Sequence, residues 1–211
     1  MPLIEELIKD NWLKTPKVIE AFKKIKRSDF LPEDSKNLAE INEALPIGFG
    51  QTISQPLVVA FMMELLDLHE GDKVLDVGSG SGWTSALLAE IVGKKGKVIS
   101  LDIIQELKDF GEKNVSKYNF VKKGIVQFFC LDGNNGYPNI SSHPEFVEGF
   151  DKILASASAV NIPDSWKKQL KIGGRIVAPV DSSIWLLIKK NETDFEEKEH
   201  PGFIFVPLLK K

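Results

Sequence analysis

The nine residues VLDVGSGSG, at positions 74–82, decide the fold of this chain. An apolar run that contains Asp76 passes directly into three glycines at alternate positions. Apolar residues then recur at helical spacing over 87–92, and a second apolar run, Val98–Leu101, again ends in an acid, Asp102. Strand, turn, helix and strand in this order form a βαβ unit. Such a unit places a glycine turn and an acidic side chain at the same edge of a parallel sheet.

The glycine spacing separates two classes of nucleotide cofactor. Dinucleotide sites use the pattern G-x-G-x-x-G, whereas here the third glycine, Gly82, comes one place early and Trp83 takes the dinucleotide position. A carboxylate at Asp76 would repel a pyrophosphate and attract an ammonium group. Asp102 is placed to accept hydrogen bonds from ribose hydroxyls. These features suit an amino acid head, a cationic sulfur and an adenosine, so the sequence predicts S-adenosyl-L-methionine as cofactor and S-adenosyl-L-homocysteine as its product.

A simpler interpretation of the same residues stays open at this point. Glycines in a strand-to-helix turn also serve close packing, and an acid such as Asp76 can instead cap a helix. A glycine motif alone is weak evidence. The combination of two strands, two acids, three glycines and a helix favours the cofactor interpretation.

The composition is that of one soluble globular domain, with 211 residues of which 43% are hydrophobic and 27% charged. A net charge of −3 predicts neither a nucleic-acid partner nor a membrane partner. The single cysteine, Cys130, excludes an intrachain disulfide and predicts a reducing, cytoplasmic location. We expect Cys130 to lie in the core and the protein to be a monomer.

The alternation of strands and helices predicts an α/β fold, a doubly wound Rossmann-like methyltransferase sheet. We expect it to be mostly parallel, with an antiparallel C-terminal strand pair and N-terminal helices. The single domain 1–211 would divide into helices and a long entry loop (1–56), a cofactor-binding core (57–180) and the antiparallel strands (181–211). The expected parallel strands are Lys73–Val77, Lys97–Leu101, Ile125–Cys130, Phe150–Ala155 and Gly174–Pro179, and the expected terminal pair is Ile184–Lys190 and Phe203–Leu208.

Motifs along nearly the whole chain resemble those of one family. The most specific is LPIGFGQTISQP at positions 45–56. The others are VLDVGSGSG itself, GKVI leading to Asp102, Asp132-Gly133 followed by GYP, QLKIGGR with VAPV, and the closing FVPL. In these motifs the chain resembles the protein-L-isoaspartate O-methyltransferases, which are class I S-adenosylmethionine-dependent methyltransferases.

The resemblance implies residue roles. Ser54 matches the active-site serine of the family, and the two residues before it would line the cofactor and acceptor side. Residues 78–80 would hold the methionine end of the cofactor, Asp102 the ribose, and Asp132 with Gly133 the adenine. The complete implied cofactor set is Thr52, Ile53, Asp76, Gly78, Ser79, Gly80, Gly82, Asp102, Ile103, Asp132 and Gly133.

Two of these assignments have a structural alternative, and three positions depart from the family. Asp132-Gly133 alone reads as a plain turn, and Ser54 alone reads as a helix N-cap.

Leu57 stands where many members carry histidine, and a glutamine that helps bind the cofactor in many members is missing near Ser183. The segment 155–161, often rich in alanine, reads ASASAVN. These departures surround the acceptor side, so they concern substrate preference more than the cofactor.

The implied reaction is methyl esterification of the α-carboxylate of L-isoaspartyl residues in damaged peptides and proteins. An α-carboxyl group has a pKa of about 3.5, so it is ionised at pH 7 and needs no general base. The sequence agrees, because no Ser–His–Asp set is evident. We expect His69, His143 and His200 at the surface, and they lack metal-ligand spacing.

Two rival functions remain compatible with the sequence. The first is a class I methyltransferase with another acceptor, such as an aspartate of a specialised peptide or an RNA base, although the near-neutral charge argues against RNA. The second is a non-catalytic module that only binds the cofactor.

Overall fold

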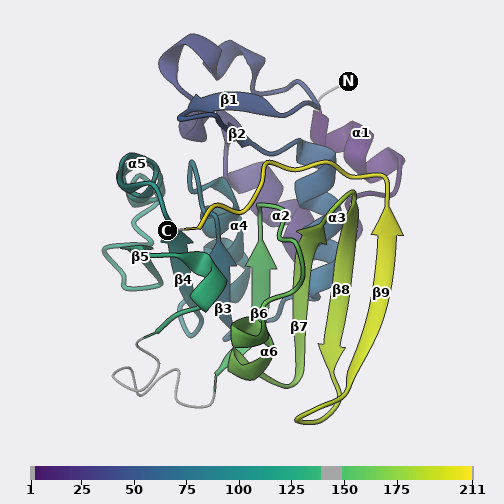
Figure 1. Cartoon of the computed structure of the whole chain (residues 1–211). Helices are drawn as coiled ribbons and strands as arrows, with labels where there is room; N and C mark the ends of the chain where they lie inside the picture. Colours follow the sequence, from purple (N-terminus) through teal and green to yellow (C-terminus); the bar gives the residue numbers. More distant parts are fainter. Residues whose placement is uncertain (1–2, 139–148, 211) are drawn as a thin grey trace.

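A computed structural model describes residues 3–138 and 149–210 and shows a seven-stranded sheet at its centre (Figure 1). The strand order is β5-β4-β3-β6-β7-β8-β9. Strands β3 to β7 are parallel, whereas β8 and β9 are antiparallel to their neighbours. The strands are β3 (Lys73–Val77), β4 (Lys97–Asp102), β5 (Val126–Cys130), β6 (Phe150–Ala155), β7 (Leu170–Val180), β8 (Ser183–Lys189) and β9 (Phe195–Pro201). The predicted fold class is confirmed.

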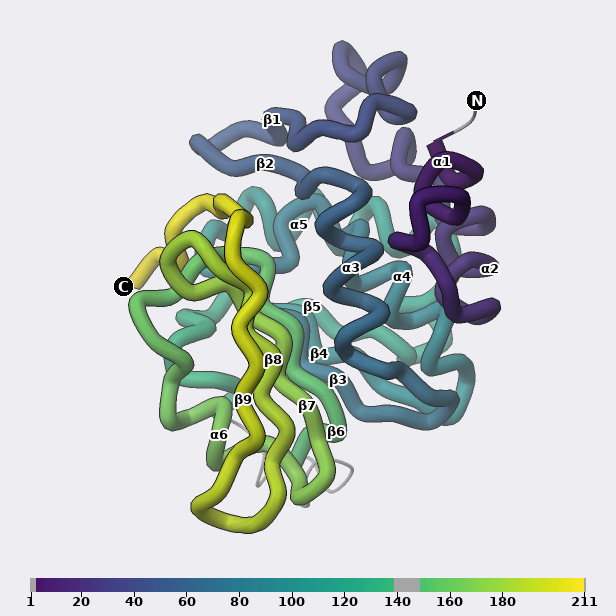
Figure 2. Tube along the Cα trace, turned by 90° about the vertical axis from the view of Figure 1, so that its right-hand side faces the viewer, coloured from purple at the N-terminus to yellow at the C-terminus, as the bar shows by residue number. Residues whose placement is uncertain are grey.

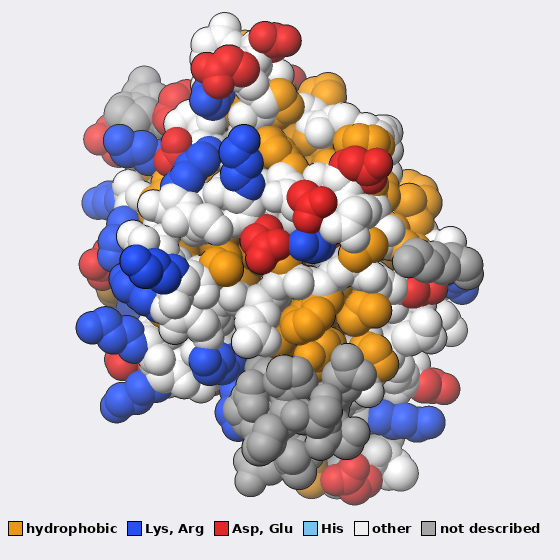
Figure 3. Space-filling view, turned by 90° about the vertical axis from the view of Figure 1, so that its left-hand side faces the viewer, with side chains coloured by type: hydrophobic (Ala, Val, Ile, Leu, Met, Phe, Trp, Pro, Cys, Tyr) orange, Lys and Arg blue, Asp and Glu red, His pale blue; other side chains and the backbone are white. Residues whose placement is uncertain are grey.

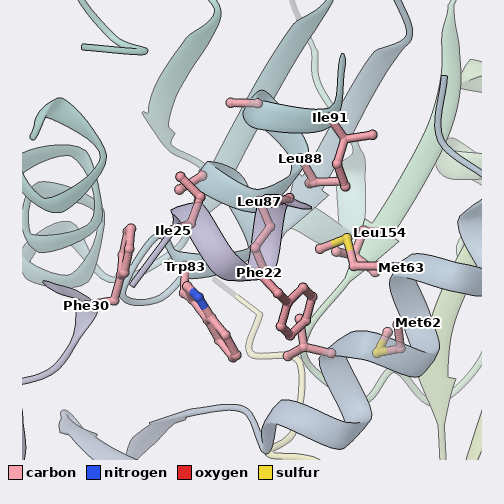
Figure 4. Packing of buried hydrophobic residues seen from close by; sticks show 14 of the residues in the cluster. Phe22, Ile25, Phe30, Met62, Met63, Trp83, Leu87, Leu88, Ile91 and Leu154 are labelled. Carbon is pink, nitrogen blue, oxygen red and sulfur yellow. The ribbon is translucent and has the colours of Figure 1, made fainter. Parts of the chain in front are cut away.

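Helices cover both faces of this sheet, as a doubly wound fold requires. On one face, α2 (Pro16–Lys24) packs against α4 (Trp83–Val92) and α3 (Pro56–Leu66), with Phe22, Trp83 and Leu87 at the contact between α2 and α4 (Figure 4). The helices α1 (Leu3–Lys9) and α5 (Gln105–Ser116) contribute buried residues to the same cluster. On the other face, Trp166 of the short α6 (Asp164–Gln169) packs with Leu75 and Ile99.

The strand order reverses direction between β3 and β6. From β3 the chain continues through β4 to β5 on one side, and it then returns to place β6 on the other side of β3. In open α/β sheets ligands bind in the crevice at the carboxyl ends of the strands where this reversal occurs. The topology alone therefore locates a binding site above β3, β4 and β6.

The prediction for the C-terminal strand pair was wrong in one member. The partner of β8 is β9, and Phe203–Leu208 is not a strand of the sheet. Strand β9 has the sequence FEEKEHP with mostly exposed side chains, so it lacks the apolar alternation that marks a strand. Charged residues on an edge strand oppose pairing with other chains.

Residues 203–208 instead run across the carboxyl ends of the strands, below the hairpin of β1 (Leu45–Gly48) and β2 (Gln51–Ile53) (Figure 2). Ser158 holds this segment, because its N–H donates to the carbonyl of Val206 at 2.8 Å and its carbonyl accepts from the N–H of Leu208 at 2.7 Å. Val206, Pro207 and Leu208 line one wall of a cavity, whereas Phe203 and Phe205 pack against the hydrophobic core.

The long entry loop expected up to residue 55 is more regular than predicted. It contains two 3-10 helices, η1 (Arg27–Phe30) and η2 (Glu33–Leu38), and a hairpin of β1 (Leu45–Gly48) and β2 (Gln51–Ile53). Short 3-10 turns bury few side chains at a regular spacing, so the sequence carries little signal for them.

No helix in residues 3–138 or 149–210 combines the length and the apolar character that a membrane span requires.

Candidate active site

A cavity lies at the carboxyl ends of β3, β4 and β6, where the strand order reverses. It encloses about 720 Å³ of space, including the part open to solvent. Six segments far apart in the sequence form its walls. The lining residues lie within 51–54, 77–84, 101–107, 131–133, 156–157 and 206–209.

The cavity brings together nine of the twelve residues that the sequence singled out. They are Thr52, Ile53, Ser54, Gly78, Ser79, Gly80, Asp102, Ile103 and Gly133. The other three, Asp76, Gly82 and Asp132, do not line it. Each of these three supports a lining residue or lies close behind one.

The glycine turn follows β3 and wraps over the end of β4. The N–H groups of Gly78 and Ser79 both donate to the carbonyl of Leu101, at 2.9 and 3.0 Å. Gly82 has a φ of 84° and precedes α4, and a Cβ on it would lie 2.8 Å from the carbonyl oxygen of Gly111 in α5. Gly82 therefore serves the contact between the turn and α5, as the packing interpretation proposed for it.

Asp102, at the end of β4, holds the turn from the other side. Its carboxylate accepts from the N–H of Gly80 at 2.8 Å and from the N–H of Ile104 at 2.9 Å. Burial raises the pKa of Asp102, and the backbone hydrogen bonds oppose that rise. The carboxylate is fixed on the cavity wall, where it could accept further hydrogen bonds from a ligand.

Asp76 is completely buried between β3 and the first turn of α4. One carboxylate oxygen accepts from the hydroxyls of Thr84 at 3.0 Å and Ser85 at 2.6 Å. Burial raises the pKa of Asp76 to about 6, despite these two hydrogen bonds. Asp76 is thus ionised at neutral pH and places a negative charge behind the glycine turn.

Asp132 caps the short 3-10 helix η3 (Gly133–Asn135), as the turn interpretation expected. Its carboxylate accepts from the N–H of Asn134 at 2.9 Å. The carbonyl of Gly133 accepts from the N–H of Gly136 at 3.0 Å and from Nε1 of Trp166 at 2.7 Å. The cap thereby fixes Gly133 in the cavity wall.

Ser54 follows β2 and is half-buried on the cavity wall. It does not cap α3, because the N-cap of that helix is Gln55 and has no side-chain capping bond. The side chain of Asn42 performs this task by accepting from the N–H of Leu57 at 3.0 Å. The alternative structural role of Ser54 is therefore excluded.

Two further sets of residues that shape this site are not among the twelve predicted site residues. Val206 to Leu209 close one wall of the cavity, and their apolar character had suggested a strand. Arg27 is 6% exposed and binds the carbonyl of Ser54 at 3.2 Å. An arginine in a stretch rich in charged residues gives no sequence signal that it is buried.

The positions that depart from the family lie at different distances from the cavity. Ser156 and Ala157 of the segment 155–161 line it. Ser183 is buried outside it, and its hydroxyl donates to Glu199 at 2.6 Å. Leu57 packs partly buried against the core at the start of α3.

His200 is only half-exposed and lies in a strand, not in the loop context that was predicted for it. This residue lies in β9, edge-on to Phe61 with ring centroids 5.0 Å apart, and its Nε2 is buried. His69 is exposed as expected, and His143 lies outside the described residues. Cys130 is half-buried at the end of β5. Among the residues described, no group of histidine, cysteine and acidic side chains could hold a metal ion.

The cavity suits the predicted cofactor. Asp102 offers a carboxylate for ribose hydroxyls, and Ile103 and Leu131 supply apolar surface for a base. The hydroxyl of Ser79 is buried on the wall and finds no hydrogen-bond partner within 3–138 and 149–210. A buried polar group of this kind calls for a ligand partner. The residues present therefore fit a nucleoside with a charged amino acid head.

Comparison with known proteins supports the same family over the whole length of the chain. The sequence profile of the family "Protein-L-isoaspartate(D-aspartate) O-methyltransferase (PCMT)" matches residues 1–211. The chain is 40% identical over 211 residues to a Methanopyrus kandleri protein-L-isoaspartate O-methyltransferase, covering 98% of this chain and 89% of that protein. It is 45% identical over 195 residues to protein-L-isoaspartate O-methyltransferase 2 of Archaeoglobus fulgidus, covering 91% of this chain and 84% of the relative.

Solved structures share the fold. A Plasmodium falciparum structure, described as a protein-L-isoaspartate O-methyltransferase in complex with S-adenosyl-L-homocysteine, superposes with a TM-score of 0.87 at 22% identity. The match covers 99% of this chain and 97% of that one. The expected family resemblance is confirmed by the full-length profile match and by the relatives at 40% and 45% identity. The chain therefore belongs to the protein-L-isoaspartate(D-aspartate) O-methyltransferase family.

Proposed function

We propose that this protein uses S-adenosyl-L-methionine to methylate the α-carboxylate of L-isoaspartyl residues in damaged peptides and proteins, a repair reaction. The observation that carries the proposal is the position of Ser54. It lines the same cavity as the glycine turn and Asp102, although it comes from the segment 45–56, which carries the most specific motif of the resemblance. One cavity thus has a cofactor half and an acceptor half.

The cofactor half consists of residues 78–80, Asp102, Ile103 and Gly133. Asp102 would accept from the ribose hydroxyls, and Ile103 and Gly133 would contact the adenine. Asp76 would act through its charge on the ammonium group, because it does not line the cavity. When bound, the cofactor supplies an electrophilic methyl group on a cationic sulfur.

The acceptor half positions a carboxylate that is already ionised. The Ser54 hydroxyl would donate a hydrogen bond to one carboxylate oxygen and leave the other oxygen to react. Alignment of this kind can contribute roughly 7–11 kcal/mol to catalysis. The segment 206–209 and the β1–β2 hairpin would exclude water from the reacting groups.

The acceptor is an extended peptide segment, because damaged residues occur in many sequence contexts. Contacts to the peptide main chain bind such a segment with little side-chain selectivity. Two large apolar side chains near the site are available for contact. Phe49, at the tip of the β1–β2 hairpin, is 58% exposed, and Ile204 is 92% exposed.

A methyl-transfer assay tests the proposal. Labelled methyl donor is supplied with an isoaspartyl peptide and with its normal aspartyl twin. We expect a base-labile methyl ester on the isoaspartyl peptide alone. Transfer to the aspartyl twin or to RNA would support a different acceptor, and donor binding without any transfer would support a binding module.

Replacing Ser54 with alanine is expected to lower kcat about tenfold, because one hydrogen bond to a charged group is lost. Affinity for S-adenosyl-L-homocysteine should change less than about threefold by calorimetry, since other residues carry cofactor binding. Normal kcat in this variant would remove Ser54 from the mechanism.

Lowering the pH through about 6 is expected to weaken binding of S-adenosyl-L-homocysteine. Burial raises the pKa of Asp76 to about 6, so the carboxylate gains a proton in this range and ceases to attract an ammonium group. We expect a three- to tenfold loss of affinity, roughly, between pH 7.5 and pH 5. The Asp76→Asn variant should bind weakly at both values. Equal pH dependence in the two proteins would exclude Asp76 as its source.

We also propose that the protein acts in the cytoplasm as a monomer without nucleic acid. A single cysteine suits a reducing compartment. On the face shown in Figure 3, Lys and Arg side chains gather along one edge, with acidic side chains among them. Light scattering of the purified protein tests the monomeric state. A band shift with RNA at physiological salt would contradict the proposal that the protein binds no nucleic acid.

A further inference from the structure

Arg27 is a buried cation that the proposed mechanism does not yet use. It lies at the start of η1, and its side chain is only 6% exposed. Its guanidinium donates to four backbone carbonyls. They belong to Ala39 at 3.2 Å, Ile41 at 2.9 Å, Glu43 at 2.7 Å and Ser54 at 3.2 Å.

The same guanidinium also contacts Trp83, which directly follows the glycine turn of the cofactor half. Its central carbon lies 5.4 Å from the ring centroid of Trp83, in a cation–π arrangement. Trp83 is the first residue of α4, follows the glycine turn directly and lines the cavity. One side chain therefore contacts the backbone of the loop around Ser54 (the serine loop) and the helix that follows the glycine turn.

The segment that Arg27 holds is itself attached to the start of α3. The side chain of Asn42 accepts from the N–H of Leu57 at 3.0 Å, and the carbonyl of Asn42 accepts from Nε2 of Gln55 at 2.9 Å. Residues 39–43 and the loop around Ser54 are thus joined at two points, by Asn42 and by Arg27. Burial lowers the pKa of Arg27 to about 10, so the guanidinium remains charged at neutral pH.

We propose that Arg27 is a positioning residue, which holds the carbonyl of Ser54 so that the serine side chain faces the glycine turn. The inference rests on the proposed function of Ser54. A planar guanidinium can bind several carbonyls and lie over an aromatic ring at the same time, whereas a lysine ammonium is a point charge without that geometry. Loss of Arg27 would release the acceptor half of the site and leave the cofactor half in place.

The test compares Arg27→Lys and Arg27→Met with the whole wild-type protein. We measure kcat and KM with an isoaspartyl peptide, and the affinity for S-adenosyl-L-homocysteine by calorimetry. In Arg27→Met we expect kcat/KM to fall about 30-fold, because small displacements of a reacting group have large effects on rate. Arg27→Lys should recover part of the loss, and cofactor affinity should stay within about threefold in both.

Tyr118→Phe is the matched control for a general loss of stability. The hydroxyl of Tyr118 accepts from the N–H of Lys26 and donates to Asp29, so it anchors the same 3-10 helix without touching the serine loop. We expect this variant to have a lower Tm and an unchanged kcat.

Unchanged kcat/KM in a folded Arg27→Lys or Arg27→Met variant would overturn the inference. An equal loss of kcat in Tyr118→Phe would also overturn it, because the effect would then be general. If Arg27→Met does not fold, Arg27→Lys alone decides. A wild-type protein that transfers no methyl group to the isoaspartyl peptide would contradict the proposed function instead.

Discussion

Replacing Asp102 with alanine is expected to weaken binding of S-adenosyl-L-homocysteine by at least about 100-fold. A hydrogen bond to a charged group contributes about 1.5–3 kcal/mol, and Asp102 would accept two from the ribose hydroxyls. The variant also loses the acceptors for the N–H groups of Gly80 and Ile104. The glycine turn would then be less well ordered before the ligand binds. Isothermal titration calorimetry measures the loss.

Asp109→Ala is the control, because it removes the same charge from an exposed site on α5. Asp109 is 59% exposed, pairs with Lys108 and does not line the cavity. Its affinity for the ligand should equal that of the wild type. An Asp102→Ala variant that binds as tightly as Asp109→Ala would contradict the assigned role.

Replacing Gly82 with alanine is expected to lower the Tm by roughly 4–16 °C. A residue other than glycine at this φ of 84° costs about 1 kcal/mol. The added Cβ would also lie 2.8 Å from the carbonyl oxygen of Gly111 and 2.9 Å from Val115, and such overpacking costs about 1–3 kcal/mol. In a chain of this size, each kcal/mol lowers the Tm by about 2–4 °C. Scanning calorimetry measures the change.

Gly173→Ala separates the two contributions. Gly173 has a φ of 81°, and a Cβ on it would meet no atom within 4 Å. It therefore carries the backbone cost alone, and its Tm should fall by about 2–4 °C. Equal Tm values for the two variants would mean that the contact between the glycine turn and α5 contributes nothing to stability.

The parallel core of the fold could be predicted because its strands are buried on both faces. Such strands form continuous apolar runs, and the order of strands and helices then limits the topology. Strand β9 could not be predicted in this way, since its position at the edge leaves its side chains in solvent. For residues 203–208 the error was the opposite, because their apolar side chains line the cavity, pack against the core or lie in solvent without adding a strand to the sheet.

The cofactor half of the site was predictable for a related reason. Its residues come from one βαβ unit, so their spacing in sequence reflects their spacing in space. The acceptor half combines residues 51–54 with Arg27 and with the segment 206–209. These parts are far apart in sequence and come together only through tertiary packing. Local sequence patterns do not predict contacts of this kind. For Ser54 the assignment depended on the resemblance to the family.

The turn that Asp132 caps has a consequence for the chemical ageing of the protein. Asn135 is followed by Gly136, and an asparagine before glycine loses its side-chain amide readily when the next backbone nitrogen attacks the side-chain carbonyl and expels ammonia. Here that nitrogen donates to the carbonyl of Gly133, and Gly136 is buried. Cyclisation would require this hydrogen bond to break. The folded turn therefore protects Asn135, two residues from Gly133 in the cavity wall, from becoming the kind of lesion that the enzyme itself would repair.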